Sequence, residues 1–323
     1  MLPPMVDFAA RNTPIRPADR LGAALGLPAG TLWFKRDDLT GLAGGGNKSR
    51  KLELLVGDAL AQGCDVLVTG GAAQSNHVRA TGSAARAAGL DCVAVLAESE
   101  PKTVPEGNLV LDDLFGIDIV WTTVEQRAAA FDATIERLRS EGRRPYEIPL
   151  GGSSPVGAAA YATCATEIEL ALDAAGSARP LVVTAVGTGG THAGLAAGFG
   201  DHSRVQGYDV AAVPTVDAHI APLADAIADL LGQERPTGEV RLDRSQASVP
   251  YGEPTDAVFE ALRLVADTEG VVLDPVYSGR AMAGLIGGVA RGEFTGETTI
   301  VFVHTGGMPA LFTARYRDRF RVG

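Results

Sequence analysis

Short apolar runs alternate with longer amphipathic segments along most of the chain. Each run is too short for a helix, and a turn rich in glycine or polar residues follows it. The pattern predicts strands at 66–69, 92–96, 117–121, 181–186, 205–213 and 299–303. It predicts helices after the turn at 70–76, over 105–114 and 124–141, from 154, after 191, and over 220–231, 256–268 and 279–291. On the helix at 124–141 one apolar face is expected from Ala128, Phe131, Ile135 and Leu138.

This alternation is typical of an α/β fold, in which mostly parallel open sheets carry helices on both faces. Ligands of such folds bind beyond the carboxyl ends of the strands. Three glycine-rich turns, 70–76, 187–191 and 304–307, follow predicted strands. We therefore expect all three turns to face one crevice.

Composition and charge narrow the classes of protein. A chain of 323 residues corresponds to about two domains. Its 28 basic and 39 acidic residues give a net charge of −11, which disfavours a nucleic-acid partner. No apolar run reaches the ~18 residues of a membrane span, and the start of the chain does not resemble a signal peptide. Cys64, Cys92 and Cys164 lack metal-ligand spacing and indicate reduced core thiols, so we expect a cytoplasmic protein without a metal.

The stretch 44–51 places three cations in four residues directly after three glycines. It could be an exposed basic start of a helix. It also approaches the pattern of a nucleotide-binding P-loop, but Asn47 stands between Gly46 and Lys48 and breaks the register that this loop requires. A third interpretation is a lysine that forms a Schiff base, in a partly desolvated pocket where other cations lower its pKa.

Two further turns suggest anion binding. Residues 74–77, Gln-Ser-Asn-His, precede a predicted helix, whose N-terminal N–H groups favour a carboxylate or an oxyanion. An ordinary helix cap needs only one such residue. Residues 187–191, Gly-Thr-Gly-Gly-Thr, offer consecutive N–H groups and two hydroxyls, which suits a phosphate, although a simple tight turn has a similar composition.

Two loop tyrosines and one serine are further candidates for chemistry. Tyr251 and Tyr277 stand in glycine-flanked loops, where a tyrosine either stacks on an aromatic ligand or packs in the core. Ser153 is not a nucleophile elbow, because Pro155 occupies the position of the last glycine in G-x-S-x-G.

Five motifs in order carry a resemblance to a known family. They are Gly-Gly-Asn-Lys-Ser-Arg-Lys, Gln-Ser-Asn-His, Gly-Thr-Gly-Gly-Thr, Asp-Pro-Val-Tyr and His-Thr-Gly-Gly. Over nearly the whole chain the sequence resembles the family of 1-aminocyclopropane-1-carboxylate (ACC) deaminase and D-cysteine desulfhydrase. The resemblance implies pyridoxal 5′-phosphate (PLP), the tryptophan synthase β-like fold (fold type II) and a homodimer. It further implies a large domain of residues 1–48 and 156–323, a small domain of residues 49–155, and a site between them.

The resemblance also implies roles for single residues. Lys48 would form the Schiff base, and Lys51 would help to hold the phosphate. Tyr277 would stack on the cofactor ring and Tyr251 would lie near the reacting atoms, both with catalytic roles, while Ser75 is a candidate proton carrier. The other implied cofactor contacts are Asn47, Asn76, Gly187, Thr188, Gly189, Gly190, Thr191 and Thr305. The implied substrate contacts are Gln74, Ser75, Asn76 and His77.

Two positions separate the branches of this family. The ACC deaminase branch looks to carry Glu and Leu where this chain has Ser278 and Thr305. A neutral hydroxyl gives a weaker electron sink than an acid, which is enough to expel a thiolate but not to open a cyclopropane. The sequence therefore favours β-elimination from D-cysteine, giving pyruvate, sulfide and ammonia. The alternatives are ACC deamination, a lyase acting on another β-substituted amino acid such as cysteate, a non-enzymatic PLP carrier, and a phosphate- or NTP-binding protein.

Overall fold

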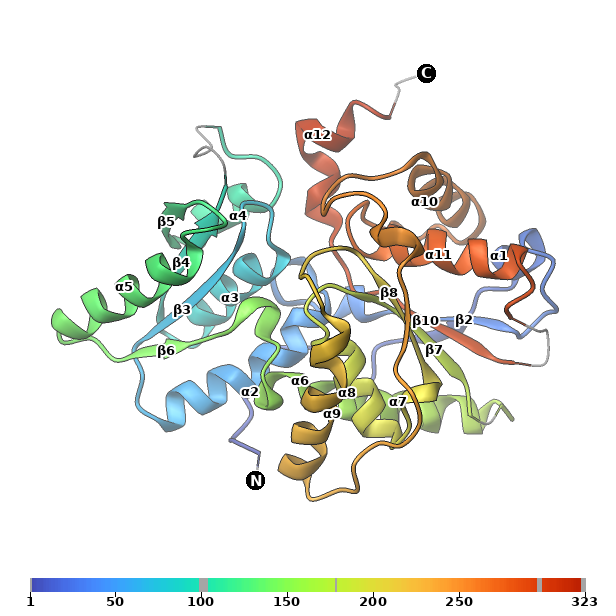
Figure 1. The fold of residues 1–323 in the computed structure, drawn as a ribbon, viewed down its shortest axis with the longest axis horizontal. Coiled ribbons are helices and arrows are strands. Elements are labelled where there is room, and N and C mark those ends of the chain that lie inside the picture. The colour runs from blue at the N-terminus through green and yellow to red at the C-terminus, as the bar shows by residue number, and fades with distance from the viewer. Residues whose placement is uncertain (1, 99–103, 178, 295–297, 321–323) are drawn as a thin grey trace.

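Two open sheets organise the chain, as a computed structural model shows for residues 2–98, 104–177, 179–294 and 298–320 (Figure 1). The larger sheet has the order β1 (Ile15–Pro17), β2 (Leu32–Lys35), β10 (Ile300–Val303), β7 (Leu181–Val186), β8 (Val205–Asp209) and β9 (Arg241–Asp243). The smaller sheet has the order β5 (Asp118–Thr122), β4 (Asp91–Ala97), β3 (Val66–Ala72) and β6 (Pro145–Glu147). Only the β1–β2 pair among them is antiparallel. This confirms the predicted fold class.

Helices cover both faces of each sheet. The larger sheet carries α1 (Asp19–Ala24), α10 (Asp256–Glu269) and α11 (Ser278–Ala290) on one face, and α7 (Ala160–Ala174), α8 (Gly190–Phe199) and α9 (Asp217–Leu231) on the other. The smaller sheet carries α2 (Asn47–Ala61), α3 (Asn76–Ala87) and α4 (Asn108–Leu114) on one face, and α5 (Arg127–Ser140) on the other. Shorter helices are η1 (Asp37–Leu39), η2 (Leu42–Gly44), η3 (Leu150–Gly152), α6 (Pro155–Ala158), η4 (His202–Arg204), η5 (Ser245–Ala247), η6 (Met308–Phe312) and α12 (Ala314–Arg317).

Strict alternation of side chains explains why the central strands are apolar throughout. On β3, Val66 and Val68 pack against α5, while Leu67 packs on the opposite face with α2 and α3. On β7, Val183 and Val182 likewise enter different core clusters. Burial on both faces favours a continuous apolar run over an alternating one.

Several predicted boundaries were wrong. Gly70 and Gly71 belong to β3, which reaches Ala72, so that turn is shorter than expected. The strand predicted over 205–213 ends at Asp209, and the helix predicted from 105 begins at Asn108. Ala128 lies on the exposed side of α5 instead of its apolar face. Burial of the three cysteines also varies, since Cys64 is only half-buried while the other two are buried; all three are free thiols.

The helix α2 links the two sheets. Its Leu52 and Leu55 pack with the smaller sheet, whereas Leu54 packs with helices of the larger one. The domain boundaries expected at 49 and 155 stay a prediction. The first of them falls inside α2, and this helix contributes to the cores of both sheets. Among the described residues, no helix has the length and apolarity needed to cross a membrane.

Candidate active site

A cavity of about 360 Å³ lies between the two sheets, a volume in the range of small-molecule sites. Residues from all three glycine-rich turns line it, which confirms that they face one crevice. Of the predicted site residues, the cavity wall includes Asn47, Lys48, Lys51, Ser75, Asn76, His77, Gly187, Thr188, Gly189, Gly190, Thr191, Tyr251, Tyr277 and Thr305. Among the described lining residues none is acidic.

Two lysines on the first turn of α2 enter the cavity. The Nζ atoms of Lys48 and Lys51 donate to the Gly151 carbonyl at 3.3 and 3.2 Å, and no described carboxylate pairs with either lysine. Burial lowers the pKa of Lys48 to about 8. Burial and the charge of Lys48 together lower the pKa of Lys51 well below its usual value. Such a pair favours a bound anion and supplies an amine that loses its proton near neutral pH.

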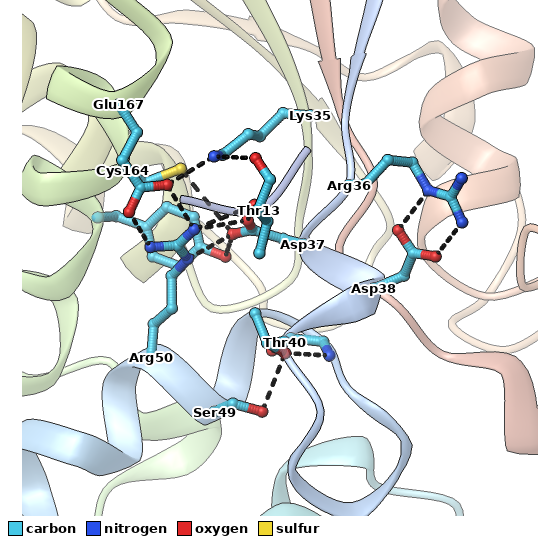
Figure 2. A network of polar contacts seen from close by, with 12 residues as sticks. Thr13, Lys35, Arg36, Asp37, Asp38, Thr40, Ser49, Arg50, Cys164 and Glu167 are labelled. Atoms are coloured by element: carbon cyan, nitrogen blue, oxygen red, sulfur yellow. Dashed lines mark hydrogen bonds and ion pairs between the residues drawn. The ribbon is translucent and has the colours of Figure 1, made fainter. Parts of the chain in front are cut away.

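A buried ionic network fixes the start of α2 (Figure 2). Arg50 bonds Asp37 of η1 through Nε and Nη2, each at 2.9 Å, and bonds Glu167 of α7 at 2.8 Å. Lys35 completes the network from β2, with its Nζ 2.5 Å from Glu167. Although burial raises the pKa of both carboxyls, Arg50 and Lys35 hold those pKa values below their usual range. The two cations and two anions balance, and Arg50, unlike Lys48 and Lys51, does not line the cavity.

The loop 187–191 forms a cradle at the N-terminus of α8. Thr188 Oγ1 lies 2.7 Å from Ser153 Oγ, and Lys51 Nζ donates to the same serine at 3.2 Å. Asn47 Nδ2 donates to Thr191 Oγ1 at 2.9 Å, which joins the loop to α2. A Cβ added to Gly190 would stand 2.6 Å from Lys51 Nζ. Glycine at this position therefore keeps open a space bounded by N–H groups, hydroxyls and a lysine.

The motif 74–77 divides into residues that line the cavity and one that does not. Ser75 caps α3, its Oγ accepting from Val78 N at 3.3 Å. Burial, followed by the charges of Lys48 and Lys51, lowers the pKa of His77 well below its usual value, so this ring is neutral at neutral pH. Gln74 does not line the cavity.

The Gln74 side chain instead holds the loop before α4. Its Nε2 donates to the Glu106 carbonyl at 2.9 Å, and its Oε1 accepts from Asn108 N at 2.8 Å. Asn108 in turn donates to Asn76 Oδ1 at 3.0 Å. Gln74 is thereby placed behind the wall that the other three residues of its motif form.

Two tyrosines close the side of the cavity that belongs to the larger sheet. The hydroxyls of Tyr251 and Tyr277 are hydrogen-bonded to each other, and their ring centroids lie 5.9 Å apart. Burial raises the pKa of each, so both are neutral phenols at physiological pH. Thr305 lines the cavity, whereas Ser278 does not, because its Oγ donates to Asp274 Oδ1 at 2.6 Å within the buried start of α11.

Sequence reasoning missed several lining residues. Leu150 and Gly151 come from η3, and Gly151 is the first residue of the segment 151–155, which departs from the nucleophile-elbow pattern. The glycine pair 151–152 was a usable signal for this part of the wall. Arg127 at the start of α5 gave no signal, because it is one arginine within an ordinary amphipathic helix.

The fold and the cavity together define a class of proteins: two-sheet α/β enzymes with a buried lysine facing an anion cradle. Residues 6–306 match the family model described as "Pyridoxal-phosphate dependent enzyme", and the chain belongs to this family.

Two curated relatives, both D-cysteine desulfhydrases, match nearly the whole chain. The one from Yersinia pestis (strain Pestoides F) is 40% identical over 319 residues, covering 96% of this chain and 95% of the relative. The one from Salmonella typhimurium (strain LT2) is 42% identical over 320 residues, with the same coverage.

Solved structures agree on the fold. An ACC deaminase homologue superposes with a TM-score of 0.85 at 36% identity, covering 98% of this chain and 95% of its own. A threonine deaminase isoform from Solanum lycopersicum reaches 0.65 at 19% identity, covering 93% of this chain and 80% of its own, and it shows the fold alone.

The residues present fit pyridoxal 5′-phosphate. The cradle at 187–191 suits a phosphate dianion, and such a dianion would give Lys51 the anionic partner that it lacks among the described residues. Lys48 is a buried amine that loses its proton near neutral pH, as a Schiff-base lysine requires.

Proposed function

We propose that this protein catalyses β-elimination from D-cysteine. One D-cysteine and one water give one pyruvate, one sulfide and one ammonia. The observation that carries the proposal is the identity of 40–42% to D-cysteine desulfhydrases over 96% of the chain. The cavity supports it with the lysine, anion sites and proton-carrying hydroxyls that such a reaction needs.

We assign the cofactor to the side of the cavity between α2 and α8. Lys51, Asn47 and the loop 187–191 would hold its phosphate. Tyr277 would pack on the cofactor ring. The tyrosine lies beside the loop 187–191, because a Cβ added to Gly187 would stand 3.2 Å from Tyr277 Cε1. Asn76 and Thr305 would contact the ring edges, and Lys48 would carry the cofactor covalently.

We assign the substrate carboxylate to the start of α3. There Ser75, Asn76 and His77 line the cavity beside the free N–H groups of the first turn. The neutral His77 adds no charge that would trap the product. This placement puts the substrate Cα between the smaller sheet and the lysine of α2.

Proton transfer falls to groups that already face the cavity. Bound PLP supplies an electron sink for the bond that breaks at the substrate Cα. The Lys48 amine, with its pKa lowered to about 8, accepts a proton near neutral pH. Ser75 and the hydrogen-bonded pair Tyr251 and Tyr277 are placed to hold a proton near the leaving group.

ACC deamination is the second candidate, because one of the similar solved structures, at 36% identity, is an ACC deaminase homologue. The composition of the cavity favours the first. None of its described lining residues is acidic, and Thr305 is a neutral hydroxyl. A cavity that no described acidic side chain lines gives the weaker sink, which suits expulsion of a thiolate better than opening of a cyclopropane.

Product release from three amino acids tests the proposal. The purified protein loaded with PLP is given D-cysteine, L-cysteine or ACC, and sulfide and pyruvate or 2-oxobutanoate are measured. We expect sulfide and pyruvate in equal amounts from D-cysteine and no turnover of ACC. A K48A variant is the control and should be inactive. Turnover of ACC without sulfide release would replace the proposal by the second candidate.

We also propose a homodimer in a reducing, cytoplasmic compartment. The family resemblance supports the dimer, and the three unpaired cysteines support the compartment. Light scattering during size exclusion should give twice the chain mass of 33.3 kDa. Cell fractionation should place the protein with cytoplasmic markers.

A further inference from the structure

One cation of the cavity has no task in the proposed reaction. Arg127 is the first residue of α5 and lines the cavity from the smaller sheet, on the side opposite the tyrosines. Its guanidinium has no ion pair or hydrogen bond with any described residue. Most arginines of this helix behave differently: Arg137 pairs with Glu141 and Arg139 with Glu136.

The wall beside Arg127 is built to leave room. Gly70 of β3 lies beside it, and a Cβ added there would lie 3.2 Å from the Val95 carbonyl oxygen, 3.7 Å from Leu150 Cδ2 and 4.0 Å from Arg127 Cδ. Gly71, Ala72 and Ala97 also line the cavity from the two neighbouring strands. These small residues leave room in the cavity on the side of Arg127.

Charge within the cavity points to a third anion. Lys48, Lys51 and Arg127 line it, and no described lining residue is acidic, although the chain as a whole carries a net charge of −11. The cofactor phosphate accounts for Lys51, and the start of α3 accounts for the substrate carboxylate. Arg127 therefore remains for a further negative group of the substrate.

We infer that Arg127 forms an anion subsite for the β-substituent of the substrate, so that the enzyme prefers amino acids whose β-substituent is already ionised before it departs, such as a thiolate or a sulfonate. This inference rests on the proposed β-elimination. A guanidinium suits such groups because its fork of N–H donors matches their oxygen or sulfur acceptors. The site is half-buried, so its contribution to affinity is modest.

Two substrates of different charge separate this role from a grip on the α-carboxylate. The variant R127Q is compared with wild type at about pH 9, where D-cysteine, with a thiol pKa of about 8.5, is largely a thiolate. The second substrate is β-chloro-D-alanine, whose substituent is neutral before it departs. We expect kcat/KM for D-cysteine to fall about tenfold and that for β-chloro-D-alanine to change less than about twofold. R127K should recover part of the loss. An equal loss on both substrates would overturn the inference.

A binding measurement tests the subsite without turnover. Calorimetry with 3-sulfopropanoate, which lacks an amine and cannot react, is compared with butanoate. Wild type should bind the sulfonate about tenfold more tightly than butanoate, and R127Q should bind both equally. R137Q, on the same helix but outside the cavity, is the matched control and should behave as wild type.

Different results would refute the proposed substrate, D-cysteine, and the proposed anion subsite at Arg127. If wild type does not release sulfide from D-cysteine, but its preference for the sulfonate depends on Arg127, the proposed substrate is wrong and the subsite stands. If D-cysteine is turned over but R127Q leaves the sulfonate preference intact, the subsite is refuted and the proposed function stands.

Discussion

At the scale of single residues, the cavity depends on places where side chains are absent. Gly190 is the clearest case, because any side chain there would fill the space next to Lys51 and Ser153. Its N–H group and those of its neighbours are the donors that we assign to the phosphate. Small size at one position thus supports both the shape and the electrostatics of the cradle.

The variant G190A should weaken cofactor binding at least about tenfold, because its methyl group would stand 2.6 Å from Lys51 Nζ. Titration of the apoprotein with PLP, followed by absorbance, measures the dissociation constant. G22A is the matched control, since Gly22 lies in α1 and a Cβ there would have its nearest neighbour at 3.9 Å. Equal affinities of G190A and wild type would refute the assignment of the cradle.

At the scale of elements, α2 carries both cavity lysines on one face and a buried arginine on another. Arg50 ties this helix to η1 and α7, so the positions of Lys48 and Lys51 depend on residues far from the cavity. A buried ionic network of this kind is costly to break, because removal of one partner leaves a charge without compensation.

The variant E167Q should lower the free energy of unfolding by about 3 kcal/mol, since Arg50 and Lys35 would lose a buried anion. Denaturant unfolding measures the change. D173N is the matched control on the same helix. Asp173 is exposed and forms no ion pair with a described residue, so its replacement should cost less than about 1 kcal/mol. Similar losses in both variants would show that the network adds nothing beyond an exposed carboxylate.

Acid should weaken the same network. The folded-state pKa values of Asp37 and Glu167 lie below the ordinary values of 3.8 and 4.5. A carboxyl with a lowered pKa contributes stability above its ordinary pKa and loses it as the pH falls through the folded value. We therefore expect the free energy of unfolding to fall below about pH 4, and to fall less steeply in E167Q. Parallel pH profiles of the two proteins would contradict this.

The elements also show which parts of the fold were predictable. The predicted bounds of β7 agree with the structure to the residue, because burial on both faces of the sheet produces an unbroken apolar run. The short strands β1, β6 and β9 lie at the edges of their sheets, have only three residues each, and left no such signal. Tertiary pairing, and not local sequence, defines them.

The same distinction holds for the site. Lys48, Ser75 and the loop 187–191 stand in dense local motifs, so the sequence identified them as candidates and the fold brings them to one cavity. Arg127 reaches the cavity through the packing of a whole helix. Gln74 was expected among the substrate contacts because of its motif and the family resemblance, but its side chain turns instead to the loop before α4.

At the scale of the whole molecule, the cavity lies between two sheets with largely separate cores. A ligand held from both sides, by α8 on the larger sheet and by α3 on the smaller, would join them. Ligand binding to the folded state alone raises stability with the ratio of ligand concentration to dissociation constant.

Removal of the cofactor should therefore lower the thermal unfolding midpoint. At a PLP concentration about 100 times the dissociation constant, binding contributes about 2.7 kcal/mol to the free energy of unfolding. Scanning calorimetry of the protein with and without PLP measures the shift. G190A should show a smaller shift at the same PLP concentration. An unchanged midpoint in wild type would contradict a cofactor held between the sheets.

We propose that Lys48, and not its neighbour Lys51, carries the cofactor in this cavity. Borohydride reduction of the PLP-loaded protein fixes the pyridoxyl group on the lysine that carries it, and peptide mass spectrometry then locates that lysine. We expect one pyridoxyl group per chain, on Lys48, and none in K48A. A group on Lys51, or on a lysine outside the cavity, would contradict this assignment.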